Sequence, residues 1–366
     1  MKLKFFLAVI VGPLVMTNAA PAHARSLGHF NQKGNILIVD QLNNRVIEVN
    51  TNSHAIVWQY GDGGSVAGPT TIFAPHDAER FGALTYIACT GVPPGGEPDC
   101  PSGCPDNRVI AVTKRGRIVW QYGQAGVTGS SPNELNNPVS IRVLPKKRFL
   151  ITDQGNHRVI MVKRAKNEIF WQYGTTGVSG SASNQLNNPA CAEQRHNGDI
   201  VIADQANNRV IEVNRRDVVG LQIDVLSDAT SLNSPAYAGH VQNPARAIIA
   251  DSLNNRIVEV DDNGSITFEY VTSARSGSVT NPVPTRAVRL RKSGNILISD
   301  QFNHQVIEID PTGTIVFAFG TIGVAGNGTN ELNAPCDAKV IDDYTSLTSP
   351  KGNGGGGSGF SFGPGF

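Results

Sequence analysis

The stretch NILIVDQLNNRVIEVN, residues 35–50, decides the fold because the chain repeats it. Close copies lie at residues 149–163, 199–214, 247–261 and 295–310. Each copy has two runs rich in Val and Ile on either side of an Asn-rich turn, which is the pattern of two β-strands joined by a short connection. Near-copies at a regular spacing indicate a repeat architecture.

The Asp that ends the first run marks the period. From Asp153 it recurs after 51, 47 and 49 residues, at Asp204, Asp251 and Asp300. The gap of 113 residues between Asp40 and Asp153 fits two repeats and an insertion.

A sixth copy lies in that gap in altered form. The segments ALTYIACT, residues 83–90, and DNRVIAVTKRGRIVWQYG, residues 106–123, match its two halves. Cys89 takes the place of the marker Asp, and residues 91–105 form the insertion. The sequence therefore contains six repeats.

Each repeat holds four short strand-like runs, which at a period near 50 residues favours a propeller blade over a helical solenoid. The first repeat lacks its leading strand, and LNAPCDAKV, residues 332–340, is such a strand with no blade after it. We therefore predict an all-β, six-bladed β-propeller with four-stranded blades, in which the C-terminal strand completes blade one. An open array would leave two unpaired sheet edges.

The pattern YG…G…LNNP…DIVIADQANNRVIEV is similar to the NHL repeat, which folds as a six-bladed β-propeller. The resemblance covers residues 34–341. Propellers of this kind include amidating lyases and arylsulfotransferase-like proteins, as well as modules that bind protein, RNA or small ligands. The resemblance therefore implies the fold and leaves the function open.

The chain ends carry different signals. Lys2 and Lys4 precede an apolar run at residues 5–16, and Ala-His-Ala at residues 22–24 resembles a cleavage site. We predict a signal peptide at residues 1–24, a propeller at residues 25–344 and a Gly/Ser-rich flexible tail at residues 345–366. An uncleaved amphipathic anchor is the alternative for the N-terminal segment.

Composition sets expectations about location and partners. The 366 residues carry a formal net charge of +1, which indicates no general attraction to nucleic acid or anionic membranes. We expect a secreted or periplasmic monomer with no nucleic-acid partner and no stable membrane span.

The repeated turn is interpreted as architecture, because a turn is needed in every blade and a catalytic residue only once. Asp and Asn side chains bond backbone amides in turns, and the following Arg is expected to bridge to a carboxylate, with a carboxylate on another blade as one option. His157 and His304 take the place of the second Asn and are interpreted as turn variants. The WQYG aromatic pairs at Trp58, Trp120 and Trp171 are expected to pack blade against blade.

Function is expected where the repeats differ. The innermost strand of each blade opens after a Pro, and alternation sends the second residue after that Pro the same way in every blade. These predicted ligand-binding residues are Asp77, Ser140, Cys191, Arg246, Arg286 and Asp337. Blade six is ambiguous, because Pro282 competes with Pro284 as its anchor.

If those side chains face the channel, they form a polar ring at its mouth. Its two arginines suit a carboxylate, sulfate or phosphate, and its two carboxylates could hold a divalent cation such as Ca²⁺. The alternative is that Arg286 and Asp337 neutralise each other around a water-filled channel.

Two histidines are candidate catalytic residues. His76 lies at the channel mouth, and His240 lies in the connection that enters blade five. Either could act as a general base or nucleophile. Arylsulfotransferase-like propellers use a histidine as the sulfate acceptor, so the resemblance also points to these two residues.

The five cysteines are expected to form one disulfide, Cys100–Cys104, within the insertion of blade two. A metal cluster of Cys89, Cys100, Cys104 and His76 is the alternative. Cys191 and Cys336 lie in blades on opposite sides of the ring and are not expected to pair.

Two functions remain open. The first is a binding or scaffolding module for a small ligand or protein partner, using the interblade loops at residues 123–138, 174–189 and 320–335. The second is a lyase or a sulfo- or other group transferase with its active site at the channel mouth.

Overall fold

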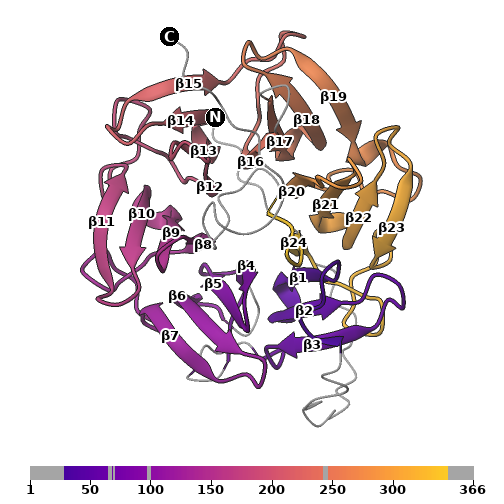
Figure 1. Cartoon of the computed structure of the whole chain (residues 1–366), viewed down its shortest axis with the longest axis horizontal. Coiled ribbons are helices and arrows are strands. Elements are labelled where there is room, and N and C mark those ends of the chain that lie inside the picture. Colours follow the sequence, from indigo (N-terminus) through magenta and orange to yellow (C-terminus); the bar gives the residue numbers. More distant parts are fainter. Residues whose placement is uncertain (1–28, 65–67, 69–70, 97–99, 242–245, 345–366) are drawn as a thin grey trace, which may run out of the picture.

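The structure is a computed structural model that describes residues 29–64, 68, 71–96, 100–241 and 246–344. Its strands form six four-stranded antiparallel sheets around a central axis (Figure 1). The fold is the predicted six-bladed β-propeller. The expected signal peptide, residues 1–24, and tail, residues 345–366, lie outside the described residues.

From the innermost strand outward, the first three blades are as follows. Blade 1 contains β24 (Pro335–Val340), β1 (Ile36–Asp40), β2 (Arg45–Val49) and β3 (Ile56–Tyr60). Blade 2 contains β4 (Pro75–Phe81), β5 (Leu84–Val92), β6 (Cys104–Thr113) and β7 (Ile118–Gly123). Blade 3 contains β8 (Pro138–Leu144), β9 (Arg148–Asp153), β10 (Arg158–Lys163) and β11 (Glu168–Tyr173).

The other three blades follow the same order. Blade 4 contains β12 (Cys191–Gln194), β13 (Ile200–Asp204), β14 (Arg209–Val213) and β15 (Val219–Ile223). Blade 5 contains β16 (Pro235–Val241), β17 (Arg246–Asp251), β18 (Arg256–Asp261) and β19 (Ile266–Val271). Blade 6 contains β20 (Pro284–Arg289), β21 (Ile296–Asp300), β22 (Gln305–Ile309) and β23 (Ile315–Phe319).

In the described residues, short 3₁₀ turns join the second and third strands of blades 1, 3, 4, 5 and 6, and another follows β19. They are η2 (Gln41–Asn43), η3 (Gln154–Asn156), η4 (Gln205–Asn207), η5 (Ser252–Asn254), η6 (Thr272–Ala274) and η7 (Gln301–Asn303). We call the face that carries these turns and the interblade loops the top face. The bottom face carries the turns between first and second and between third and fourth strands.

The ring closes as the sequence predicts. β24 pairs with β1, with Val340 opposite Ile36, so both chain ends contribute to one sheet. Beyond the strands, the Ile341 N–H donates to the Asn35 carbonyl at 2.8 Å. Closure therefore consists of a β-ladder and its packing.

The core lies between adjacent blades, and β1 shows why. Ile36 and Ile38 pack with Phe319 of blade 6, whereas Leu37 packs with Ile87 of blade 2. Successive side chains of a strand point to opposite faces of its sheet. Because both faces of β1 are covered, its sequence is a continuous apolar run.

The marker Asp organises each turn, as blade 1 illustrates. One carboxylate oxygen of Asp40 accepts from Asn43 and from Arg45 Nε at 2.6 Å, and the other accepts from the Asn333 N–H at 2.7 Å. The Arg therefore pairs with the Asp of its own blade, and the suggestion of a bridge to a carboxylate on another blade is wrong here. Its remaining donors reach carbonyls of the loop that enters the blade, such as that of Glu331.

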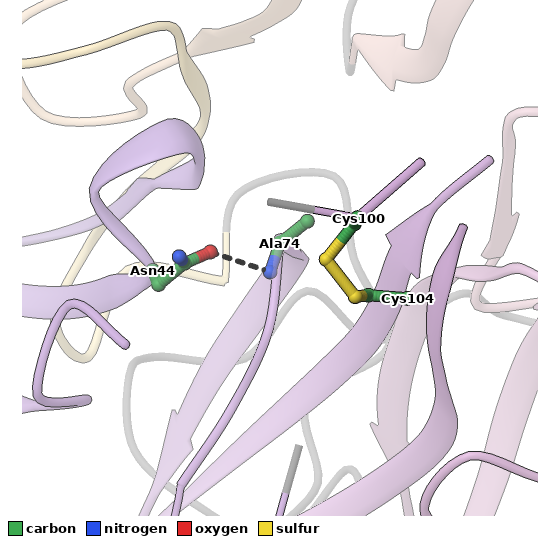
Figure 2. Close-up of a disulfide and its surroundings, with 4 residues drawn as sticks. All are labelled: Asn44, Ala74, Cys100 and Cys104. Carbon is green, nitrogen blue, oxygen red and sulfur yellow. Dashed lines mark hydrogen bonds between the residues drawn. A yellow bond between two sulfur atoms is a disulfide. The ribbon is translucent and has the colours of Figure 1, made fainter. Parts of the chain in front are cut away.

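The second Asn of the turn joins one blade to the next. Its backbone is left-handed, and its side chain accepts from a backbone N–H just before the innermost strand of the following blade. In blade 1, Asn44 accepts from Ala74 at 2.8 Å, near the disulfide (Figure 2). His157 and His304 use Nδ1 for the same bond, at 3.1 and 3.0 Å, which confirms them as turn variants. The bond recurs at Asn107, Asn208 and Asn255, so all six blade junctions have it.

In two blades, one member of the Asp–Arg pair is missing and a residue from elsewhere takes its role. In blade 2, Cys89 lies opposite Pro75, where other blades have the Asp, and Asp106 bonds both Arg108 and the Phe73 N–H instead. The sequence alignment of this altered blade is thus confirmed.

Blade 6 has Gln305 where the other blades have Arg, and Arg275 from the preceding loop reaches Asp300 at 2.6 Å. Its innermost strand starts at Pro284, which resolves the ambiguity of the anchor. Pro282 stands where other blades supply an N–H to the Asp. Since Pro has no N–H, Asp300 Oδ1 has no hydrogen-bond partner in the part of the chain that the structure describes.

The cysteines follow the predicted pairing. Cys100 and Cys104 form a disulfide, and Cys89, Cys191 and Cys336 are free and buried. The described ranges contain no group of three or more His, Cys, Asp or Glu that could hold a metal ion, so the alternative cluster around Cys89 is not formed. Nor do they contain a helix long and apolar enough to cross a membrane.

Candidate functional site

The six innermost strands place one side chain each in a ring around the channel. These side chains are Asp77, Ser140, Cys191, Tyr237, Arg286 and Asp337, and each is at most 4 % exposed. Five of them are positions that the sequence predicts for the ring.

The sixth predicted position, Arg246, is wrong. The backbone of Arg246 opens β17, the second strand of blade 5, and lies opposite Asp261 of β18 in the strand register. The innermost strand is β16, whose sequence PAYAGHV has small residues where the other blades have more typical strand residues. The prediction took the next Pro as the anchor, and Tyr237 occupies the place in the ring instead.

A second layer of charge lies two residues further along the same strands. It consists of Glu79, Arg142, Glu193 and Lys339, all on the channel side because alternation repeats every two residues. This layer was not predicted from the sequence, because only one position in each strand was compared between blades. The same alternation, applied once more, would have found it.

The two layers form a closed circuit of ion pairs. Arg142 contacts Asp77 at 2.9 Å and Glu193 at 2.6 Å, and Arg286 contacts Glu193 at 3.3 Å and Asp337 at 2.9 Å. The Arg286–Glu193 contact joins blades 6 and 4, so these side chains meet across the channel.

Lys339 and Tyr237 complete the circuit. The Lys339 ammonium contacts both Asp77 and Asp337, and the guanidinium of Arg286 lies 4.3 Å from the centre of the Tyr237 ring. The two carboxylates that could have held Ca²⁺ therefore share a cation of the protein itself. A good Ca²⁺ site needs six or more oxygens, and this donor set does not fit one.

Burial and charge together set the ionisation of the circuit. Burial opposes ionisation of Asp77, but Arg142, Lys339 and Arg286 outweigh it and hold its pKa well below the usual range. Burial raises the pKa of Asp337, although Lys339 and Arg286 partly offset this. The neighbouring cations therefore outweigh burial at Asp77 but not at Asp337.

Glu79 is the least compensated carboxylate, and it gives a testable pH dependence. Burial raises its pKa from 4.5 to about 7, despite Arg142 and Lys339. A carboxyl with a raised pKa in the folded state binds its proton more tightly there. Its contribution to stability is therefore present below pH 4.5 and is lost as pH rises through about 7.

We expect the Glu79→Gln variant to lose this dependence. Between about pH 4.5 and 7, the free energy of unfolding of the wild type should fall relative to the variant by about 3 kcal/mol. Urea unfolding of both proteins at several pH values measures the difference. If the free energies of unfolding of the two proteins changed in parallel with pH, Glu79 would be ionised in the folded state over this whole pH range.

The two candidate catalytic histidines lie apart. His76, near the top of β4, places Nδ1 3.1 Å from the Val139 carbonyl, and burial lowers its pKa. His240 lies inside β16, near the bottom, not in a connection as predicted. Burial and then Arg195, whose guanidinium lies 3.5 Å away, lower its pKa to about 4. The two imidazoles are therefore at opposite ends of their strands and share no site.

The top face has a different chemistry. Large apolar side chains stand exposed at the centres of three adjacent 3₁₀ turns: Leu253 is 53 % exposed, Phe302 40 % and Leu42 38 %. Val225 and Val324, in the loops that enter blades 5 and 1, are similarly exposed. We call these five residues the apolar arc.

Hydrogen bonds hold the backbone of the three turns that carry the apolar arc. The N–H groups of Leu42, Leu253 and Phe302 each donate to a carbonyl just before the innermost strand of the same blade, at 2.8 to 3.1 Å. Gln301 donates to Gln41 at 3.1 Å, which links the turns of blades 6 and 1. Blades 3 and 4 have Gly155 and Ala206 at the equivalent position, so exposed apolar residues at the centre of this turn occur only in blades 5, 6 and 1. Val127 and Val178, in the loops that enter blades 3 and 4, are also exposed but lie outside the arc.

The interblade loops are also held by the repeated motif. In three of them a Gly N–H bonds a buried Leu carbonyl at 3.0 to 3.1 Å, and the first Asn of a turn binds the carbonyl of the same Gly at 2.8 Å. The glycines are Gly129, Gly180 and Gly326. The top face is therefore preorganised.

Comparison with known proteins supports the fold. No family model matches the chain, and no curated protein matches its sequence. A solved protein of unknown function from Bacteroides caccae is similar in structure, with a TM-score of 0.55, 14% identity, and coverage of 84% of this chain and 98% of that one. A streptogramin B lyase has a TM-score of 0.51, 13% identity, and coverage of 86% and 87%. At such identities the likeness shows the fold alone.

Proposed function

We propose that this protein is an exported propeller of the NHL type that binds a protein partner through the apolar arc on its top face. The observation that carries the proposal is the grouping of five exposed large apolar side chains on adjacent turns and loops of one face. Single exposed apolar residues are ordinary. A group of them on one face is typical of a protein interaction site.

The surroundings of the arc favour a protein over a small charged ligand. The arginines of the top-face motif are engaged with carboxylates inside the blades, as Arg256 is with Asp251 at 2.8 Å. An apolar centre surrounded by a polar rim is the usual anatomy of a protein interface. The Asn- and Ser-rich loops around the arc supply such a polar rim.

The central ring gives less support to an enzyme. Its predicted ligand-binding charges are already paired with other charges of the protein: Asp77 contacts Arg142 and Lys339, and Arg286 contacts Glu193. A substrate would have to displace buried ion pairs to reach them. The disulfide Cys100–Cys104 fits a secreted or periplasmic location.

The proposal predicts that Leu253→Asp and Phe302→Asp each weaken partner binding by about 30-fold or more, as expected when an interface anchor is lost. Val316→Asp is the matched control, because Val316 is 54 % exposed on the outermost strand of blade 6. Photo-crosslinking from position 302 in an extract of the source cells identifies the partner. Calorimetric titration of the purified partner then measures each variant.

Equal crosslinking from positions 302 and 316 would contradict the proposal. So would a partner whose affinity is the same for Phe302→Asp and Val316→Asp. A thermal melt of each variant shows that the propeller is intact.

A further inference from the structure

The bottom face of blades 2, 3 and 4 is strongly basic. Its turns, at residues 114–117, 145–148, 163–168, 195–199 and 214–217, contain twelve Lys and Arg against three Asp and Glu. We call these turns the basic crescent. Its positive residues are Lys114, Arg115, Arg117, Lys146, Lys147, Arg148, Lys163, Arg164, Lys166, Arg195, Arg215 and Arg216.

The rest of the bottom face differs. The turns between the third and fourth strands of blades 5, 6 and 1 read DDNGS, DPTGT and NTNSHA, without a Lys or Arg. Arg291 and Lys292, in the β20–β21 turn of blade 6, lie outside the crescent. Although the net charge is only +1, the fold therefore gathers many of the Lys and Arg residues on the bottom face of blades 2, 3 and 4.

Most of the positive charge in the crescent is exposed. Lys114, Arg115, Lys146, Lys147 and Arg216 are all exposed side chains. Lys163 reaches Glu168 only at 3.8 Å, with both side chains half exposed, and such surface pairs interact weakly.

Like charges are also brought together. Burial, and then the charge of Arg215 of blade 4, lower the pKa of Arg148 of blade 3. The guanidinium of Arg215 lies directly over Gly198, where even a Cβ would meet it. A surface that holds cations side by side is suited to an anionic partner.

Tryptophans of the preceding blades fix the position of these turns. Trp58 Nε1 donates to the Lys114 carbonyl at 3.0 Å, Trp120 to Asn167 at 2.9 Å and Trp171 to Asp217 at 3.0 Å. The bond to Asp217 also engages one of the three carboxylates in the crescent. The basic turns are thus held at the same end of three neighbouring sheets, which form one side of the ring (Figure 1).

We infer that the basic crescent docks this protein peripherally on an anionic phospholipid surface. Exposed turns at the same end of adjacent sheets suit a planar partner, and clusters of Lys and Arg are attracted to anionic lipid headgroups. Single-stranded nucleic acid is favoured less, because proteins that bind it stack its bases on aromatic side chains. The crescent turns contain no Phe, Tyr or Trp.

The test is sedimentation of the full chain with vesicles. We expect binding to vesicles of phosphatidylcholine with about 30% phosphatidylglycerol, little binding to phosphatidylcholine alone, and loss of binding at high salt. The double variant Lys146→Glu/Lys147→Glu should bind at least about tenfold more weakly. Arg291→Glu/Lys292→Glu makes the same change in net charge outside the crescent and should bind nearly as the wild type does.

Three outcomes would overturn the inference: no binding of the wild type, binding that does not depend on anionic lipid, or equal losses for both double variants. Fluorescence titration with a single-stranded oligonucleotide is run in parallel. Tight oligonucleotide binding that the crescent variant alone loses, without vesicle binding, would assign the face to nucleic acid instead. Thermal melts confirm that both variants are folded.

Discussion

Replacing Arg142 with Ala should lower the free energy of unfolding by about 3–5 kcal/mol, because it leaves two buried carboxylates without their shared cation. Arg142 is 3 % exposed and contacts Asp77 of blade 2 and Glu193 of blade 4. Urea unfolding, followed by tryptophan fluorescence, measures the change.

Two comparisons show whether charge is responsible. Arg117→Ala, at an exposed position of the bottom face, should change stability by less than about 0.5 kcal/mol. Adding Glu193→Gln to Arg142→Ala should recover part of the loss, because one uncompensated carboxylate is then removed. A loss below about 1 kcal/mol for Arg142→Ala, or no recovery in the double variant, would mean that the ion-pair circuit contributes little.

Ending the chain at Leu332 should abolish the cooperative fold. The truncation removes β24, which pairs with β1 over five residues and supplies the buried Cys336 and Ala338. It also removes Asp337 and Lys339 from the circuit. The exposed edge of β1 would then favour pairing between molecules.

The matched control is a chain that ends at Tyr344 and keeps β24. We expect the control to elute as a monomer with a single thermal transition, and the shorter chain to aggregate or melt without a cooperative transition. A synthetic peptide of residues 333–344 should restore part of the cooperative transition. A shorter chain that melts within a few degrees of the control would show that the ring does not depend on closure.

Much of the fold could be predicted because the same strand and turn pattern recurs in each repeat. The marker Asp, the Asn turn and the strand pattern recur, so blade number, strand order and closure followed from counting. Blade 2 was recognisable although Cys89 replaces the Asp, since the strands around it keep their spacing. Blade 5 was misread because β16 is built from small residues and a second Pro lies just beyond it.

The central site was harder to predict. Alternation identified Asp77, Arg286 and Asp337 correctly as channel residues, but the contacts between blades depend on side-chain reach. Arg142 and Glu193 were not predicted because alternation was applied to only one position in each strand. The apolar arc and the basic crescent were not predicted either. Net charge and the percentage of hydrophobic residues describe the whole chain, and only the fold shows which residues gather on one face.

The way the ring closes has a consequence for where the chain needs to begin. Asn35 and Ile341 are hydrogen-bonded neighbours, and Tyr344 donates to the Arg80 carbonyl on the same face. Both ends of the described chain thus lie at the bottom face, close enough for a short linker to join them. Opening the joined chain at an exposed turn, such as that at residues 262–263, would give a circular permutant with the same six blades. The packing of each blade against its neighbours therefore does not require the break in the chain to lie in blade 1.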